Sequence, residues 1–143
     1  STPLHKAAEW CSEEHVALLL KAGAAVNVRD RAGNTPFTHA VRNPWNKTAV
    51  RDHRVFPRVA PLLLRAGADI ESADYWGSTP LVAAASEGQA RCVQLCLERG
   101  ANVHARGQHG TALEVAQKGK HEEVVEMLVQ HAAVLRAGHS ATR

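Results

Sequence analysis

The side chains that could perform chemistry begin with His121-Glu122-Glu123, a histidine followed by two glutamates. In zinc peptidases the pattern His-Glu-x-x-His places two imidazoles on one face of a helix, where they bind the metal beside a glutamate that acts as general base. Here the position of the second histidine is occupied by Val125, so the pair of metal ligands is missing. The sequence also contains no Gly-x-Ser-x-Gly segment and no glycine-rich phosphate loop. We therefore expect no catalysis, no cofactor and no metal site.

The cysteines are the next candidates for metal binding or disulfide formation, and there are three: Cys11, Cys92 and Cys96. An odd and sparse set fits a reducing compartment better than a disulfide framework, so we expect a cytoplasmic or nuclear protein. Cys92 and Cys96 lie four residues apart among aliphatic residues, as small core residues of one helix face do. No apolar run approaches the length of a membrane-spanning helix, and no leader is visible at Ser1-Thr2, so neither a membrane helix nor a signal peptide is expected.

Four copies of one sequence unit must position these residues. Thr-Pro-Leu at residues 2–4 returns as Thr-Pro-Phe at 35–37, as Thr-Pro-Leu at 79–81 and as Thr-Ala-Leu at 111–113. Each copy is followed by small residues, a polar break and an aliphatic run, and the first three units continue into Gly-Ala-x-Val or Gly-Ala-x-Ile. A repeated unit of this size is typical of a solenoid, in which every unit packs only on its neighbours.

In these residues and their order the chain resembles the ankyrin-repeat family, and the resemblance covers essentially the whole chain from Thr2. It implies an all-α solenoid of stacked helix-turn-helix units with short β-hairpin fingers, as one domain over residues 1–143. The repeats would then cover residues 2–34, 35–78, 79–110 and 111–143. The resemblance also implies that His5, which follows the first Thr-Pro-Leu, is a structural residue that hydrogen-bonds toward a neighbouring repeat.

The repeats predict four helix pairs, near residues 3–10 and 13–22, 36–42 and 58–65, 80–87 and 90–99, and 112–118 and 121–130. Threonine caps, proline at the first helical position and glycine after the last turn support these limits. Pro61 falls inside the expected second helix of repeat two, where it removes a hydrogen bond, so we expect a late start or a kink there. The last residues, 138–143, are expected to fray.

Repeat two is longer than the others because of an insert at about residues 43–57, which should bulge from between its two helices. Residues 42–58 contain five basic side chains and one aspartate, so their formal charge is +4, compared with +3 for the whole chain. Clustered positive charge attracts acidic segments or phosphates, whereas the mild overall charge does not predict nucleic-acid binding. The insert residues that we consider for partner binding are Trp45, Lys47, Arg51 and Arg54.

The resemblance further implies a protein-interaction module that binds another protein or peptide along a concave groove. Hairpin tips and the exposed ends of the first helices line this groove in the family. Aromatic residues and arginine are the types that most often carry binding energy. The candidate groove residues are Trp10, Arg31, Asn34, Arg42, Tyr75, Trp76, Glu87 and His109. Trp10 and Trp76 have an alternative role as structural wedges that pack between repeats.

Two other modes of recognition remain open at this point. Some ankyrin arrays hold methylated lysine in an aromatic cage through cation–π attraction, and Tyr75, Trp76 and Glu87 would be the cage here. Alternatively, the basic insert would bind an acidic or phosphorylated partner, with an affinity that falls steeply as the salt concentration rises. In every mode we expect a monomeric chain.

Overall fold

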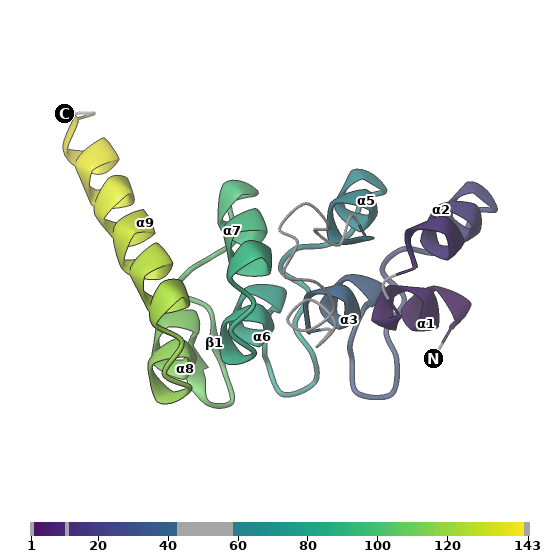
Figure 1. Cartoon of the computed structure of the whole chain (residues 1–143), viewed down its shortest axis with the longest axis horizontal. Coiled ribbons are helices and arrows are strands. Elements are labelled where there is room, and N and C mark those ends of the chain that lie inside the picture. The colour runs from purple at the N-terminus through teal and green to yellow at the C-terminus, as the bar shows by residue number, and fades with distance from the viewer. Residues whose placement is uncertain (1, 11, 43–58, 142–143) are drawn as a thin grey trace.

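The described part of the chain forms a curved stack of four helix pairs (Figure 1). The computed structural model describes residues 2–10, 12–42 and 59–141. The pairs are α1 (Pro3–Glu9) with α2 (Glu13–Lys21), α3 (Pro36–Arg42) with α5 (Val59–Arg65), α6 (Pro80–Ser86) with α7 (Ala90–Glu98), and α8 (Ala112–Lys118) with α9 (Glu122–Ala141). The all-α solenoid expected from the sequence is confirmed. None of the helices among the described residues is long and apolar enough to cross a membrane.

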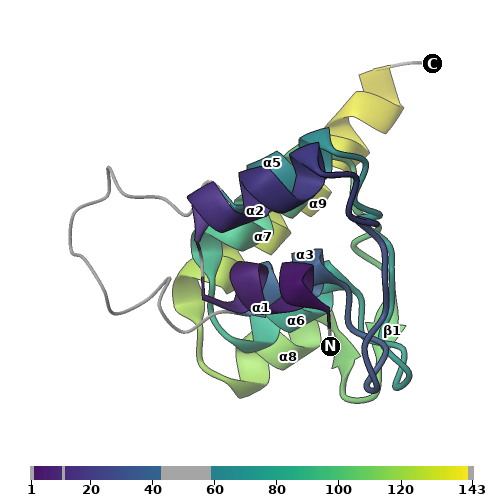
Figure 2. The same cartoon turned by 90° about the vertical axis from the view of Figure 1, so that its right-hand side faces the viewer.

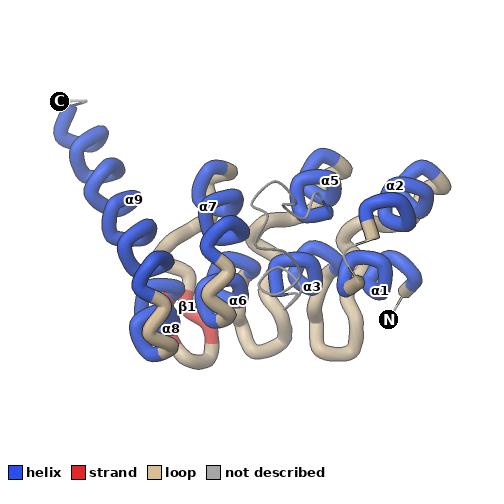
Figure 3. Tube along the Cα trace, viewed as in Figure 1, coloured by secondary structure: helices blue, strands red, loops and turns tan. Residues whose placement is uncertain are grey.

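The helices form two layers, seen along the stack in Figure 2, and hairpin fingers connect successive pairs on one side of them. The inner layer contains α1, α3, α6 and α8, each in contact with the next, and the outer layer contains α2, α5, α7 and α9. Within the described residues, strands are assigned only in the third finger, where β1 (Arg106–Gly107) pairs antiparallel with β2 (Gly110–Thr111) (Figure 3). In the first two fingers, backbone hydrogen bonds from Asp30 to Asn34 and from Asp74 to Ser78 close the turn without a ladder.

The inner helices begin where the repeated threonine predicts. The hydroxyls of Thr2, Thr79 and Thr111 accept hydrogen bonds from the backbone N–H groups three residues further on, at 3.3–3.4 Å. Pro3 and Pro80 occupy the first helical position, where the missing N–H has no partner to lose. Pro61 likewise lies in the first turn of α5, because the described helix begins at Val59. The start of this helix, expected to be late, borders residues 43–58, which lie outside the described residues.

Small residues allow the two layers to pack closely. Ala8, Ala84 and Ala116 are completely buried in the inner layer, as are the larger residues Phe37 of the inner layer and Leu63 of the outer layer. Cys92 and Cys96 belong to the same core and form no disulfide, in agreement with their expected role as small core residues. Burial in this core raises the pKa of the Cys96 thiol far above its usual value, so this thiol remains protonated.

The last helix differs from the prediction. The sequence predicted an end near Gln130, but α9 continues to Ala141 and includes the part of 138–143 that was expected to fray. The other outer helices end at glycines with positive φ: Gly23 at 89°, Gly67 at 98° and Gly100 at 80°. The equivalent residue of repeat four is Ala132, which disfavours the left-handed conformation that ends a helix. Without this stop signal the helix continues.

The insert of repeat two cannot be compared with its prediction in the same way. Trp45, Lys47, Arg51 and Arg54 all lie outside the described residues. On either side of the insert, however, α3 packs on α1 and α6, and α5 packs on α2 and α3. Both flanking helices therefore keep their places in the stack, as the regular ends of this repeat predicted.

Candidate partner-binding surface at the finger tips

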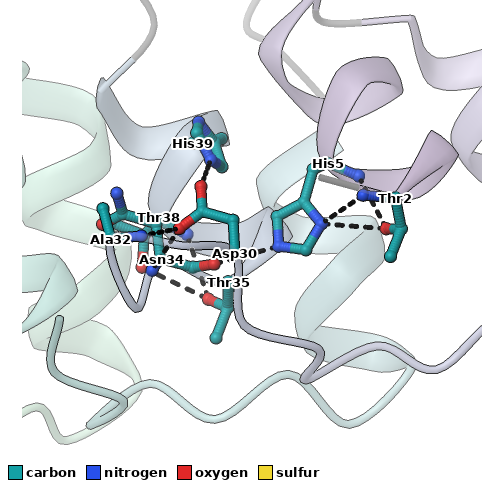
Figure 4. A network of polar contacts seen from close by, with 8 residues as sticks. All are labelled: Thr2, His5, Asp30, Ala32, Asn34, Thr35, Thr38 and His39. Carbon is teal, nitrogen blue, oxygen red and sulfur yellow. Dashed lines mark hydrogen bonds and ion pairs between the residues drawn. The ribbon is translucent and has the colours of Figure 1, made fainter. Parts of the chain in front are cut away.

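The first finger tip is built around the side chain of Asp30 (Figure 4). Its Oδ1 accepts hydrogen bonds from the N–H groups of Ala32 and Asn34, both at 2.9 Å. Gly33 completes the turn with a φ of 85°, a conformation that residues with a side chain rarely adopt. One carboxylate oxygen therefore fixes the backbone of residues 30–34.

The second finger tip repeats this construction with different side chains. Oδ1 of Asp74 accepts from the N–H groups of Trp76 and Ser78, both at 2.9 Å, and Gly77 has a φ of 86°. Tyr75 and Trp76 take the places of Arg31 and Ala32. Their side chains are 65% and 57% exposed. Two large rings are thus presented to solvent on a backbone that is held in one conformation.

The three tips are in contact with one another. The N–H of Tyr75 donates to the carbonyl of Ala32 at 3.1 Å. The Tyr75 ring lies over Gly33, because a Cβ added to this glycine would be 3.0 Å from two ring atoms. A Cβ added to Gly107 of the third finger would be 2.6 Å from Oγ of Ser78, so this finger also packs on the second. We call the continuous surface formed by residues 30–34, 74–78 and 106–110 the finger strip.

Further hydrogen bonds connect the fingers closer to the outer helices. Asn27 accepts from the N–H of Asp69 at 2.8 Å and donates to the carbonyl of Gly67 at 3.1 Å. At the next junction, Glu71 accepts from the N–H of Asn102 at 2.8 Å. Such connections between repeats hold the fingers in register before any partner arrives, which lowers the entropic cost of binding.

The two aspartates of the finger strip point toward the inner helices. The side chains of Asp30 and Asp74 are only 13% and 3% exposed, and their second oxygens face His39 at 2.7 Å and Arg42 at 3.8 Å. Although partial burial acts to raise the pKa of Asp30, hydrogen bonds from His39, Asn34 and Ala32 lower it below its usual value. Asp30 is therefore held ionised, and both aspartates are turned inward.

One residue predicted to bind a partner has a structural role instead. Asn34 is buried, and its carbonyl is 2.9 Å from Nε2 of His5 (Figure 4). The backbone N–H of Thr2 donates to Nδ1 of His5, so Nε2 carries the proton and donates to Asn34. The inclusion of Asn34 among exposed groove residues was wrong, because Asn34 is buried where repeat one meets repeat two. His5 is buried and hydrogen-bonded through both ring nitrogens, as expected of a structural residue, but its acceptor Asn34 is the last residue of its own repeat.

Two other groove candidates lie away from the finger strip. The fingers lead into the N-terminal ends of the inner helices, whereas Trp10 and Glu87 cap the C-terminal ends of α1 and α6. A seven-residue helix separates its ends by about 10 Å. Glu87 is therefore not placed to form an aromatic cage with Tyr75 and Trp76. Trp10, 69% exposed, lines an apolar groove of about 690 Å³ with Leu18 and Leu19 at the open N-terminal end of the stack.

The remaining candidates lie in or beside the finger strip. Arg31 and His109 are exposed at the first and third tips, and Arg42 reaches Asp74 from α3. The sequence prediction missed Arg106, which lies in β1 of the third finger and extends into solvent 3.4 Å from Glu114. Residues 2–10, 12–42 and 59–141 contain no group of three side chains suited to a metal.

Comparison with known proteins supports the same architecture. A family model described as "Ankyrin repeats (3 copies)" matches residues 47–137, and a second, "Ankyrin repeats (many copies)", matches residues 4–51. The potassium channel AKT2/3 of Arabidopsis thaliana is 29% identical over 141 residues, which are 92% of this chain and 15% of the channel. Rabankyrin-5 of Mus musculus is 52% identical over 42 residues, or 29% of this chain and 4% of that protein. Human Rabankyrin-5 is 52% identical over 40 residues, or 28% of this chain and 3% of that protein.

The chain thus spans a small part of each of these relatives. The first family model alone covers more than half of the chain, and together with the second it extends from the first inner helix into α9. The helix pairs, the threonine caps and the stacked fingers agree with this match along the described residues. This chain belongs to the ankyrin-repeat family.

Proposed function

We propose that this chain binds a segment of another protein along the finger strip, with Tyr75 and Trp76 at the centre of the contact. Ankyrin repeats are in general protein–protein interaction modules, and their solenoids present extended surfaces for this purpose. The observation that carries the proposal is the exposure of two adjacent large rings on the rigid second tip, between two other tips. Such rings bury a large area on binding and lose little entropy, because their backbone is already fixed.

The position of the rings favours this surface over the alternatives. Tyr75 and Trp76 have a neighbouring finger on each side, so a bound segment can make contacts in both directions. Exposed charged side chains at the first and third tips supply the polar rim that surrounds an aromatic centre in many interfaces. A methyl-lysine cage would need an anionic wall close to the rings, and Glu87 lies at the other end of α6.

The test is a comparative affinity capture with quantitative mass spectrometry. The bait is this chain as wild type, as Trp76→Ala and as Trp10→Ala, which is a matched control because Trp10 is similarly exposed but lies outside the finger strip. The proposal predicts a set of captured proteins that is depleted with Trp76→Ala and retained with Trp10→Ala. Equal depletion with both variants, or with neither, would place the partner elsewhere.

A further inference from the structure

The finger strip has a charge pattern that restricts its partner further, and this inference rests on the proposed function. We propose that the partner segment is an extended acidic peptide with one large apolar side chain at its centre and a carboxylate about three residues away on each side. The steps below derive the sign of the charge, the spacing and the anchor from described residues.

The sign of the charge follows from the directions of the side chains. The tip aspartates, Asp30 and Asp74, accept hydrogen bonds from their own turns and are largely shielded from solvent. Arg31 at the first tip is exposed and makes no ion pair within the described ranges, while Arg106 at the third tip pairs only with Glu114 at 3.4 Å. Because this pair is solvent-exposed, it is weak and open to competition from another carboxylate. A partner therefore meets cations on both sides of the rings.

Other acidic residues of the second finger do not cancel this pattern. Both side chains precede the tip and already accept hydrogen bonds: Asp69 from the N–H of Glu71, and Glu71 from the N–H of Asn102. At the third tip, Nζ of Lys118 donates to the carbonyl of His109 at 3.1 Å and adds positive charge beside Arg106. The exposed tips are thus positive at each end and aromatic in the middle.

The spacing follows from the repeat. Packed helices lie about 8–10 Å apart, so the first and third fingers are separated by roughly 20 Å. A segment in the extended polyproline II conformation advances about 3.1 Å per residue with three residues per turn, so it covers this distance in about six residues and turns every third side chain to the same face. A peptide whose apolar side chain packs on Tyr75 and Trp76 would then place residues three positions before and after it near Arg31 and Arg106. Matching this spacing requires no rearrangement of the fingers.

The probe is a fluorescein-labelled peptide of nine residues in a glycine-serine background, with leucine at the centre and glutamate three positions away on each side. Three control peptides replace both glutamates by glutamine, replace both by lysine, or move them next to the leucine. Binding to the intact chain is measured by fluorescence anisotropy at low and high salt. We expect the first peptide to bind about five- to tenfold more tightly than the glutamine peptide at low salt, with a smaller ratio at high salt.

Two variants distinguish this inference from the proposed function. Arg31→Glu combined with Arg106→Glu should reverse the preference, so that the lysine peptide binds best. Because both sites are exposed, loss of the weak pair with Glu114 should lower the melting temperature only slightly. Trp76→Ala should weaken every peptide that binds. Equal binding of the glutamate, glutamine and shifted peptides, or no binding of any peptide, would overturn the acidic pattern. In that case the finger strip is still supported as the binding surface if Trp76→Ala depletes captured proteins. If Trp76→Ala has no effect on capture, the proposed function is rejected as well.

A single-stranded oligonucleotide serves as the remaining probe. Two arginines about 20 Å apart make few of the phosphate contacts that give nucleic acids their affinity, so we expect binding weaker than that of the glutamate peptide. Tighter binding of the oligonucleotide, lost in the double arginine variant, would mean that the same cations recognise phosphate, and would overturn the assignment to an acidic peptide.

Discussion

Tyr75 of the second finger lies directly on Gly33 of the first finger. A Cβ added to Gly33 would be 2.8 Å from the amide nitrogen of Tyr75, and the glycine has a φ of 85°. The absence of a side chain at one tip therefore makes room for the aromatic residue of the next. This contact joins the two tips whose side chains form the first half of the finger strip.

Replacement of Gly33 by alanine should therefore destabilise the protein for two separate reasons. The left-handed backbone costs an alanine about 1–2 kcal/mol, and the clash with Tyr75 adds to this cost. Gly23→Ala is the matched control, because Gly23 has a φ of 89° and nothing within 4 Å of an added Cβ. Urea denaturation should show a larger loss for Gly33→Ala by about 1 kcal/mol or more. Equal losses in the two variants would mean that the second finger moves freely away from Gly33.

The side chain of Asp74 should be required for the order of the second tip. Asp74→Ala removes the acceptor of two N–H groups, and we expect a loss of about 1–3 kcal/mol together with weaker partner binding. Asp74→Asn keeps an acceptor oxygen and loses only the charge facing Arg42 at 3.8 Å, so its loss should be smaller. Denaturation curves and amide hydrogen exchange of residues 75–78 measure both effects. Asparagine and alanine variants of equal stability would contradict this role of the hydrogen bonds.

Ionisation of Asp30 should stabilise the fold in a defined pH range. Its pKa in the folded chain lies below the ordinary value of 3.8, so the unfolded chain binds a proton more readily. The stabilisation is therefore present above the unfolded pKa of about 3.9 and is lost as the pH falls through the folded pKa. Asp30→Asn should be less stable than wild type near neutral pH, and the difference should shrink below about pH 4. Urea midpoints measured across this range provide the test, and parallel curves for the two proteins would refute it.

The buried thiols should react only when the fold opens. Burial raises the pKa of Cys96, and the reactive thiolate is correspondingly rare in the folded chain. Because Cys11 lies outside the described residues, the experiment uses Cys11→Ser, which leaves Cys92 and Cys96. Iodoacetamide labelling followed by mass spectrometry should be slow in buffer and rapid in denaturant. Fast labelling of the folded chain would indicate that α7 detaches from the core.

Much of the fold could be predicted because its signals are local. Thr79 and Pro80 set the start of a helix through their own hydroxyl and ring, whatever lies around them. The extension of α9 was harder to predict, since the exchange of a glycine for Ala132 shows that a stop signal is missing but not where the helix ends.

The candidate site was less predictable because exposure depends on neighbours. Asn34 and Trp76 both belong to finger tips, but Asn34 is buried and its carbonyl accepts a hydrogen bond from His5, while Trp76 remains exposed. Trp10 and Trp76 are the same residue type at opposite ends of inner helices. Trp10 lies in the groove at the end of the stack and Trp76 in the finger strip, and only the position of each residue in the stack decides this. The role of Arg106 as an exposed cation beside the rings becomes clear only when the three fingers are compared in the structure.

The most direct test of the central claim is the dissociation constant of a captured partner, measured by isothermal titration calorimetry with wild type, Trp76→Ala and Trp10→Ala. Loss of a central aromatic residue typically costs about 2 kcal/mol, so Trp76→Ala should weaken binding about thirtyfold. Its melting temperature should stay close to that of the wild type, since the ring is exposed, and Trp10→Ala should bind normally. Unchanged affinity of Trp76→Ala, or a loss that is explained by unfolding, would contradict the assignment of the finger strip as the binding site.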